Sequence, residues 1–225
     1  MTNNVREITE MAEQGSAAAQ YMLGYSYQYG EGVEGVEQNY ETSVKWYTLA
    51  AEQGNAAAQY SLGLMYNSGK GVEQNDEGAI KWYTLAAEQG DADAQHSLGL
   101  MYNSGKGVEQ NDKTAVKWYT LAAEQGDADA QFNLATMYSD GEGVEENDET
   151  AVEWYTLAAE QGDADAQYNL SIKYEFGDGV LTNDETAVQW LALSAEQGNK
   201  YAQAKLGFKY AEGEGLANNN EAAVK

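Results

Sequence analysis

The sequence of 225 residues contains no cysteine and no proline, and it has a single histidine. Without cysteine the chain cannot form disulfides, use a thiolate nucleophile or build most structural zinc sites, so nothing in it requires an oxidising compartment. The lack of proline fits a mostly helical chain, because an interior proline breaks a helix. No apolar run approaches the roughly 20 residues of a membrane span, and the N-terminal MTNNVREITE has no signal-peptide core. We therefore expect a soluble, cytoplasmic protein without membrane insertion.

Acidic side chains dominate the charge of the sequence. There are 37 aspartates and glutamates against 12 lysines and arginines, which gives a formal net charge of −25 at pH 7. This charge repels phosphate backbones and anionic lipids, so nucleic acid is not expected as a partner. It attracts basic partners instead, more weakly as the salt concentration rises. A hydrophobic content of 43%, with 11% aromatic residues, predicts a folded chain.

A repeat of 36 residues runs through the chain. The stretch WYTLAAEQGDADAQ begins at Trp82 and again at Trp118 and Trp154. All five tryptophans keep this spacing: Trp46, Trp82, Trp118, Trp154 and Trp190. The spacing is broken once, by EGVEGVEQN at residues 31–39, which carries three residues more than its later counterparts. We place this insertion in a loop, because in a helix it would rotate the apolar face away from the core.

Each repeat is predicted to contain two helices. Residues that favour the N-cap position recur where the first helix should start: Ser16, Asn55, Asp91, Asp127, Asp163 and Asn199. A glycine just before them, such as Gly126, can take the left-handed conformation that ends the preceding helix. In the third copy Ala94, Leu98 and Tyr102 form one apolar stripe of the first helix. After a glycine loop, the second helix is capped near Asn111.

The second helix and the contact between helices also have a recurring pattern. In one copy the apolar face of the second helix is formed by Ala115, Trp118 or Tyr119, Ala122 and Ala123. A small residue recurs in the first helix and indicates a close approach of helices: Gly24, Gly63, Gly99, Ala135, Ser171 and Gly207. The pair Glu124-Gln125 also recurs, which suggests a local hydrogen bond with a partner that the sequence does not identify. Replacing Trp118 by alanine is expected to cost ~3–5 kcal/mol, as for a large buried aromatic residue.

The pattern of one copy reads A-x3-LG-x2-Y-x2-G-x-GV and then D-x2-A-x2-W-x3-AA-x2-G. Its residues are Ala94, Leu98, Gly99, Tyr102, Gly105, Gly107, Asp112, Ala115, Trp118, Ala122, Ala123 and Gly126. This pattern resembles the Sel1-like repeat, a relative of the tetratricopeptide repeat, over nearly the whole chain. The resemblance implies an all-α fold, an α-solenoid or superhelix of about five full helix-turn-helix repeats of 36 residues with partial terminal repeats. The five tryptophans would then be structural residues that hold neighbouring helices together.

The expected organisation follows the caps. Residues 1–15 form a partial repeat with an N-terminal capping helix, in which Glu7 occupies the tryptophan position. The full repeats span residues 16–54, 55–90, 91–126, 127–162 and 163–198, and residues 199–225 form a truncated repeat. The chain stops at Lys225, one residue short of the next tryptophan position, which is consistent with a fragment or with end-to-end self-association.

Catalytic and metal-binding sites are poorly supported by the sequence. His96 has no second histidine and no cysteine to form a zinc or nucleophile site with it. Acidic pairs such as Asp91 and Asp93 recur at helix starts, where negative charge is favourable, so capping is the better interpretation. The glycine loops lack the phosphate-binding motifs and the EF-hand spacing. We expect no cofactor, no metal and no enzymatic activity.

A binding surface is predicted on the first helices, opposite the core stripe. In the tetratricopeptide fold the corresponding positions line the concave surface, and the resemblance implies the same here. Two positions carry varied and often large apolar residues: Tyr21, Tyr60, His96, Phe132, Tyr168 and Ala204 at one, and Tyr25, Leu64, Leu100, Thr136, Ile172 and Phe208 at the other. Tyr60, His96, Phe132 and Tyr168 are the expected anchors, with Asp129, Asp140, Asp165 and Glu175 attracting basic groups. The alternative is that these side chains pack between adjacent repeats.

The sequence therefore predicts a scaffold that binds a protein or peptide with basic and apolar groups along the concave face. A self-associating structural module, or a fragment of a longer repeat protein, remains the alternative. An enzyme is the least favoured class.

Overall fold

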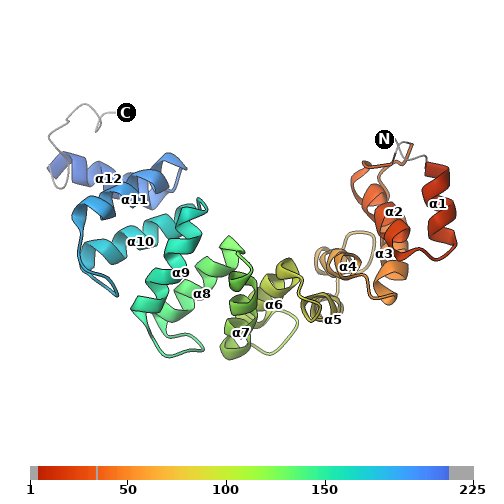
Figure 1. Cartoon of the computed structure of the whole chain (residues 1–225), viewed down its shortest axis with the longest axis horizontal. Coiled ribbons are helices and arrows are strands. Elements are labelled where there is room, and N and C mark those ends of the chain that lie inside the picture. The colour runs from red at the N-terminus through yellow and green to blue at the C-terminus, as the bar shows by residue number, and fades with distance from the viewer. Residues whose placement is uncertain (1–4, 34, 213–225) are drawn as a thin grey trace. The chain divides into compact units, whose positions relative to one another are not determined.

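The computed structural model describes residues 5–33 and 35–212, and in these residues it contains twelve α-helices and no strand (Figure 1). The helices in chain order are α1 (Val5–Glu13), α2 (Ala17–Tyr29), α3 (Tyr40–Glu52), α4 (Ala56–Ser68), α5 (Asp76–Ala87), α6 (Ala92–Ser104), α7 (Asp112–Glu124), α8 (Ala128–Asp140), α9 (Asp148–Glu160), α10 (Ala164–Phe176), α11 (Asp184–Glu196) and α12 (Lys200–Glu212). The second half of the expected terminal repeat, residues 213–225, lies outside the described residues, as do residues 1–4.

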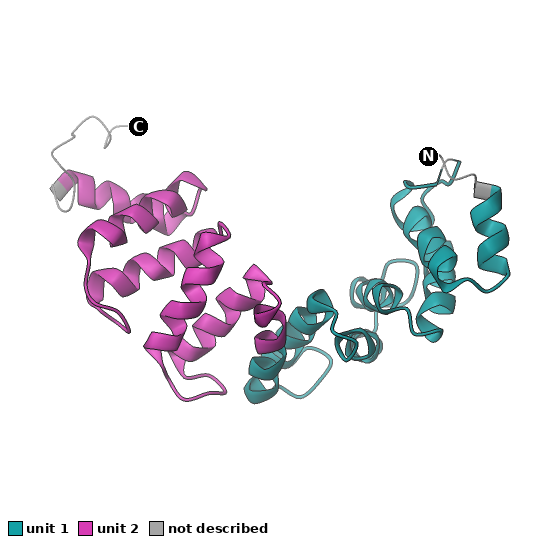
Figure 2. Cartoon of the chain, viewed as in Figure 1, with its two compact units in different colours: residues 1–118 teal, residues 119–225 magenta. Residues whose placement is uncertain are grey.

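The helices form hairpins that stack in chain order, which confirms the all-α solenoid. The even-numbered helices from α2 to α12 are the first helices of the repeats, and the odd-numbered helices from α3 to α11 are the second helices. The chain divides into two compact units, residues 1–118 and 119–225, with the boundary inside α7 (Figure 2). Consecutive helices pack against each other from α1 to α6 in the first unit and from α8 to α12 in the second. None of the helices described is long and apolar enough to cross a membrane.

Local sequence signals set the helix ends. The predicted N-caps are confirmed, because each side-chain oxygen accepts a hydrogen bond from the backbone N–H three residues later: Ser16, Asn55, Asp91, Asp127, Asp163 and Asn199. The glycine before them has a positive φ, as at Gly126 with 93°. The three-residue insertion lies in the loop between α2 and α3, as expected.

Alanine, leucine and tyrosine fill the core between hairpins. Tyr47 and Tyr83, which follow the tryptophans of α3 and α5, are 0% and 1% exposed. Each ring covers a small residue of the preceding first helix: a Cβ on Gly63 would lie 2.6 Å from Cδ1 of Tyr83, and one on Gly24 would lie 2.4 Å from Cδ1 of Tyr47. The recurring glycine therefore makes room for a buried tyrosine ring.

The tryptophans are partly buried and pack against core clusters that two consecutive repeats share. Trp46 packs against the cluster that contains Ile8 and Leu23, and Trp82 packs against the cluster that contains Tyr47. In residues 119–225, Trp190 packs against the cluster that contains Tyr155 and Leu170. Each of these clusters combines helices of the preceding repeat with the first helix of the tryptophan's own repeat. The residue after the tryptophan is the more deeply buried side chain: Tyr47, Tyr83, Tyr119, Tyr155 or Leu191.

Buried glutamines add a polar connection between repeats. Five of them, one in each first helix from α2 to α10, are 4% exposed: Gln20, Gln59, Gln95, Gln131 and Gln167. Each side-chain amide donates to the backbone oxygen eight residues earlier, for example from Gln59 to Ala51 at 3.0 Å. The side-chain oxygen of Gln59 accepts from Gln89, just after α5, and Gln89 also donates to Leu85 O. The glutamine of the recurring Glu-Gln pair therefore hydrogen-bonds both to a backbone oxygen of its own helix and to a glutamine of the preceding first helix.

Candidate functional site

The first helices of residues 1–118 carry the predicted binding residues on one face. We call this the first-helix face and define it by Tyr21, Tyr25, Tyr60, Leu64, His96 and Leu100. Tyr25 and Leu100 are the most open of these, at 42% and 45% exposed, and the other four are half-buried. The face therefore presents apolar side chains from α2, α4 and α6 that the core does not fully cover.

Part of each aromatic side chain on this face is used in packing. The ring centroids of Tyr21 and Tyr47 are 5.7 Å apart, and those of Tyr60 and Tyr83 are 5.8 Å apart. Burial raises the pKa of the Tyr47 and Tyr83 hydroxyls, so both remain protonated. These two ring contacts lie within a repeat and not between adjacent repeats: each ring rests on the second helix of its own repeat.

A first hollow, here called the tyrosine hollow, opens between α2 and α4 and reaches the start of α6. Its volume is about 240 Å³. Its walls include Tyr21, Tyr25, Tyr29, Tyr60, Asp91 and Asp93. The rings of Tyr25 and Tyr29 lie 4.7 Å apart, and Tyr29 Oη accepts a hydrogen bond of 3.2 Å from Gln28 Nε2. Aromatic faces and two carboxylates thus border one cavity.

The charge of Asp91 is partly shielded from water. Burial raises its pKa, the backbone N–H of Ala94 lowers it, and the neighbouring charge of Asp93 raises it, with a net upward shift. Asp93 itself is exposed. A partly desolvated carboxylate interacts more strongly with a nearby cation than one in bulk water, because the local dielectric constant is lower.

A second hollow of about 360 Å³, here called the leucine hollow, lies between α4 and α6. Leu64, Leu100 and Tyr83 line it together with Lys106. The Lys106 ammonium is 3.3 Å from Asp76 Oδ1 and donates a hydrogen bond of 2.6 Å to Asn67 Oδ1. Unlike the tyrosine hollow, this cavity already contains a cation of the chain.

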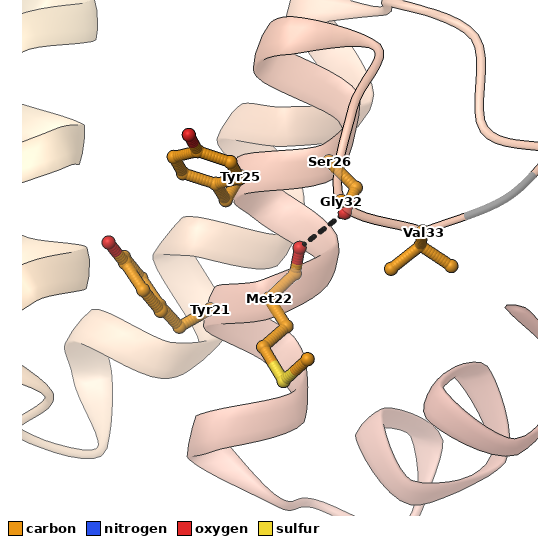
Figure 3. A pocket seen from close by; sticks show the side chains of 6 residues that line it. All are labelled: Tyr21, Met22, Tyr25, Ser26, Gly32 and Val33. Atoms are coloured by element: carbon orange, nitrogen blue, oxygen red, sulfur yellow. Dashed lines mark hydrogen bonds between the residues drawn. The ribbon is translucent and has the colours of Figure 1, made fainter. Parts of the chain in front are cut away.

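A third pocket of about 270 Å³ lies where α2 meets the loop with the insertion (Figure 3). Tyr21 and Tyr25 project from the same side of α2, and Met22 and Val33 complete an apolar lining. The Ser26 hydroxyl donates to Met22 O at 2.9 Å, so its polar group is satisfied within the helix. Since Tyr21 and Tyr25 also border the tyrosine hollow, the two cavities share a wall.

The corresponding positions in residues 119–225 are Phe132, Thr136, Tyr168 and Ile172, which are half-buried, and Ala204 and Phe208, which are exposed. The Phe132 ring lies 5.9 Å from that of Tyr155, and Thr136 Oγ1 is hydrogen-bonded to Tyr155 Oη at 3.0 Å. The Tyr168 and Tyr201 rings are 6.1 Å apart. These side chains are therefore engaged with neighbouring helices of their own unit on at least one side.

The four acidic residues expected at the rim differ in their surroundings. Asp129 and Asp140 are exposed. Asp165 is also exposed, and its Oδ1 accepts a hydrogen bond of 2.7 Å from Asn199 Nδ2. Glu175 is already paired, 2.5 Å from the Lys205 ammonium and 2.9 Å from that of Lys209. The expectation that Glu175 attracts basic groups of a partner is therefore wrong, because two lysines of the chain neutralise it.

The described residues contain no arrangement that suggests metal chemistry. Within residues 5–33 and 35–212, no three histidine, aspartate or glutamate side chains are placed to hold a metal ion. His96 is half-buried on α6. Two of the glycine loops carry the sequence SGKG, at residues 68–71 and 104–107, and their first glycines, Gly69 and Gly105, have φ near 70° and end α4 and α6. Their role is to end helices.

The sequence did not identify every residue of these cavities. Tyr29 and Asp91 line the tyrosine hollow but were not expected there, whereas Asp93 is the equivalent of Asp129 and Asp165 and lies on the face that the helical wheel turns away from the core. The spacing of Tyr21, Tyr25 and Tyr29 could have indicated the position of Tyr29, since residues at i, i+4 and i+8 share one helix face. The approach of Asp91 from the next hairpin depends on how the repeats stack, which a single repeat does not show.

The fold and the repeat define a class of protein, the α-solenoids built from short helical hairpins. The Sel1 repeat family matches residues 17–55, 56–91, 92–127, 128–163, 164–199 and 200–225, and the chain belongs to this family. Repeats of this family generally act as protein-interaction scaffolds.

Two solved structures support the assignment. A Sel1 repeat protein from Oxalobacter formigenes is 39% identical with a TM-score of 0.81, over 93% of this chain and 83% of that protein. The protein c5321, described as a protective antigen present in uropathogenic Escherichia coli strains and displaying an SLR fold, is 35% identical with a TM-score of 0.82. That match covers 98% of this chain but 54% of c5321, so this chain spans about half of its length. No curated protein sequence matches the chain.

Proposed function

We propose that the chain is a non-enzymatic scaffold that binds a protein or peptide partner on the first-helix face. The observation that carries this proposal is the set of cavities along α2, α4 and α6, bordered by open apolar side chains. Single exposed apolar residues are normal on a protein surface. A row of cavities lined by tyrosine and leucine instead has the features of a binding surface with anchor pockets.

Charge supports a basic partner. The chain carries a net charge of −25, and Asp91 and Asp93 stand at the edge of the tyrosine hollow. A partner with basic groups between its apolar anchors would gain both encounter rate and specificity from these charges. In residues 119–225 the corresponding surface, Phe132, Thr136, Tyr168 and Ile172 with Asp129 and Asp165, is proposed to contribute in the same way.

The choice of variants follows from the packing. Tyr60 and Phe132 rest on buried tyrosines, so their replacement by alanine would affect stability as well as binding. Leu100 is 45% exposed and lines the leucine hollow, which makes Leu100→Asp a better test. Leu85 is an exposed leucine of α5, with 37% exposure, and Leu85→Asp is the matched control because it adds the same charge outside the hollows.

The experiment is an affinity purification from cell lysate with the immobilised full chain and quantitative mass spectrometry. We expect Leu100→Asp to reduce recovery of the specific partner by about tenfold or more, as for an anchor residue, and Leu85→Asp to preserve it. Equal recovery by the parent and Leu100→Asp would contradict the proposed face. Light scattering of the same samples over a range of concentrations tests self-association separately.

A further inference from the structure

Helix α2 differs from the other first helices by a column of three tyrosines. Tyr21, Tyr25 and Tyr29 stand at i, i+4 and i+8, and the last two rings are 4.7 Å apart with planes inclined by 46°. The equivalent positions carry tyrosine, leucine and serine in α4 and histidine, leucine and serine in α6. The repeat does not need this column, because the later hairpins form without it.

The column faces an acidic wall. The tyrosine hollow has Tyr21, Tyr25 and Tyr29 from α2 among its walls, together with Asp91 and Asp93 from the next hairpin but one. The described residues that line this hollow include five tyrosines and two aspartates but neither lysine nor arginine. In the leucine hollow, by contrast, Lys106 is already present and paired with Asp76.

We propose that the tyrosine hollow binds the cationic head of a lysine or arginine side chain supplied by a protein partner. This inference rests on the proposed scaffold function and specifies the chemistry that one part of the first-helix face recognises. The negative faces of the tyrosine rings attract a cation that is withdrawn from water. The two carboxylates add a charge that favours a cation and repels an anion.

The chain itself forms contacts of this kind at other positions. The Lys81 ammonium lies 5.1 Å from the Trp82 ring centroid, and that of Lys205 lies 5.4 Å from the centroid of Phe176. Such distances are within the range of an energetically significant cation–π interaction. The partial burial of Asp91 works in the same direction, because a desolvated carboxylate gains more from a cation than a fully hydrated one.

The test uses the full chain labelled with ¹³C in its leucine methyl groups. Leu64 lines both hollows and Leu100 lines only the leucine hollow, so a shift of the Leu64 methyl resonances with unchanged Leu100 resonances reports occupancy of the tyrosine hollow. The probes are the capped tripeptides Ala-Lys-Ala and Ala-Arg-Ala, with Ala-norleucine-Ala as the uncharged match. We expect both cationic peptides to shift the Leu64 methyl resonances in a saturable way and the norleucine peptide to leave them unchanged.

Two double variants that use residues from other repeats of the chain separate binding from folding. Tyr25→Leu with Tyr29→Ser gives α2 the residues found at the same positions in α4. Asp91→Asn with Asp93→Ala gives the start of α6 the residues of α4, including its asparagine cap. Each double variant should fold and should weaken binding of the lysine peptide by about fivefold or more.

Several outcomes would overturn the inference. An equal Leu64 shift with the norleucine peptide would mean that the hollow recognises apolar groups only. No Leu64 shift with either cationic peptide, or unchanged binding by both double variants, would exclude a cation site. The scaffold proposal would survive these results if Leu100→Asp still lost the partner in the affinity purification, so the two failures can be distinguished.

Discussion

The side-chain amide of Gln89 donates a hydrogen bond of 2.6 Å to the side-chain oxygen of Gln59, which belongs to the preceding first helix. Gln59 in turn donates to Ala51 O, in the last turn of α3, at 3.0 Å. One buried amide therefore connects the ends of two second helices through the first helix between them. The same arrangement recurs at Gln20, Gln131 and Gln167.

Replacing Gln59 by leucine should lower the free energy of unfolding by about 1–3 kcal/mol, because the buried Ala51 oxygen loses its side-chain donor and Gln89 loses an acceptor. Urea unfolding followed by circular dichroism measures the change. The control is Gln74→Leu, at an exposed loop glutamine that donates to Asn67 O, where the loss should be within about 0.5 kcal/mol. Equal effects of the two substitutions would contradict a special role for the buried glutamine.

Adding a methyl group at Gly63 should destabilise the chain, although alanine is usually the better helix former. A Cβ there would lie 2.6 Å from Cδ1 of the buried Tyr83, so the ring must move, at a cost of about 1–3 kcal/mol. At Gly207, in α12, a Cβ would meet no atom within 4 Å, and Gly207→Ala should stabilise by up to about 1 kcal/mol. Thermal unfolding of both variants tests this difference in sign, and stabilisation by Gly63→Ala would contradict the close ring contact.

The capping aspartates Asp91 and Asp163 should produce a pH dependence of stability. Burial is the largest cause that raises their pKa in the folded state. A raised carboxylate pKa means that the folded chain holds the proton more tightly, so stability falls as pH rises from the unfolded value of about 3.9 through the folded one. At pH values above the folded-state pKa, both aspartates are charged in the folded chain, and this charge lowers the free energy of unfolding.

The variant that tests this is Asp91→Asn with Asp163→Asn, because asparagine already caps α4 and α12 at Asn55 and Asn199. It should lose less stability than the parent when urea unfolding is repeated from about pH 3 to pH 7. The control Glu88→Gln with Glu160→Gln removes the same number of charges at exposed positions. If both double variants change the pH profile equally, net charge rather than burial of the caps is responsible.

Glu175 should show the opposite pH dependence. Burial alone would raise its pKa, but the hydrogen bonds and charges of Lys205 and Lys209 outweigh burial, and the net shift is downward. The stabilisation is therefore present above the unfolded glutamate pKa of about 4.3 and is lost as pH falls through the lower folded value.

Glu175→Gln is thus expected to cost about 1–2 kcal/mol at neutral pH, between the values for exposed and buried ion pairs, and little in strong acid. Urea unfolding at the two pH values measures this. Glu149→Gln, at an exposed position of α9, is the control and should have little effect at either pH. A constant loss from Glu175→Gln at both pH values would show that the side chain acts through packing and not through its charge.

Much of the fold could be predicted from residues that act locally. The caps at Asp91 and Asn55 and the left-handed Gly126 set helix ends by interactions within a few residues, so their pattern in the sequence is sufficient. The relative burial of Trp118 and Tyr119 could not be decided in this way, since both lie near the apolar face. The structure shows Tyr119 at 1% exposure and Trp118 as partly buried. The cost predicted for Trp118→Ala therefore applies better to a tyrosine such as Tyr83.

The candidate site was less accessible to sequence reasoning because it depends on contacts between repeats. A helical wheel places Tyr25 and Leu100 on the open side, where the structure has them. It gives no information on the tyrosines that Tyr21 and Tyr60 rest on, or on the lysines that neutralise Glu175. The tyrosine partners lie on the second helix of the same hairpin and the lysines lie on the first helix of the next one, so a wheel of a single helix shows neither.

The direction of the glutamine hydrogen bonds has a consequence for how such a chain can change in length. Gln20, Gln59, Gln131 and Gln167 each donate to the helix that precedes their own hairpin and accept from a glutamine at the end of their own hairpin. Duplication or deletion of one complete unit of 36 residues would therefore leave each remaining amide with partners of the right kind. Extra residues in a loop are also tolerated, since Gln20 keeps both of its hydrogen bonds although the loop after α2 carries three additional residues. A gain or loss of whole repeats would then yield longer or shorter proteins that still fold, with a different number of surface positions available for variation.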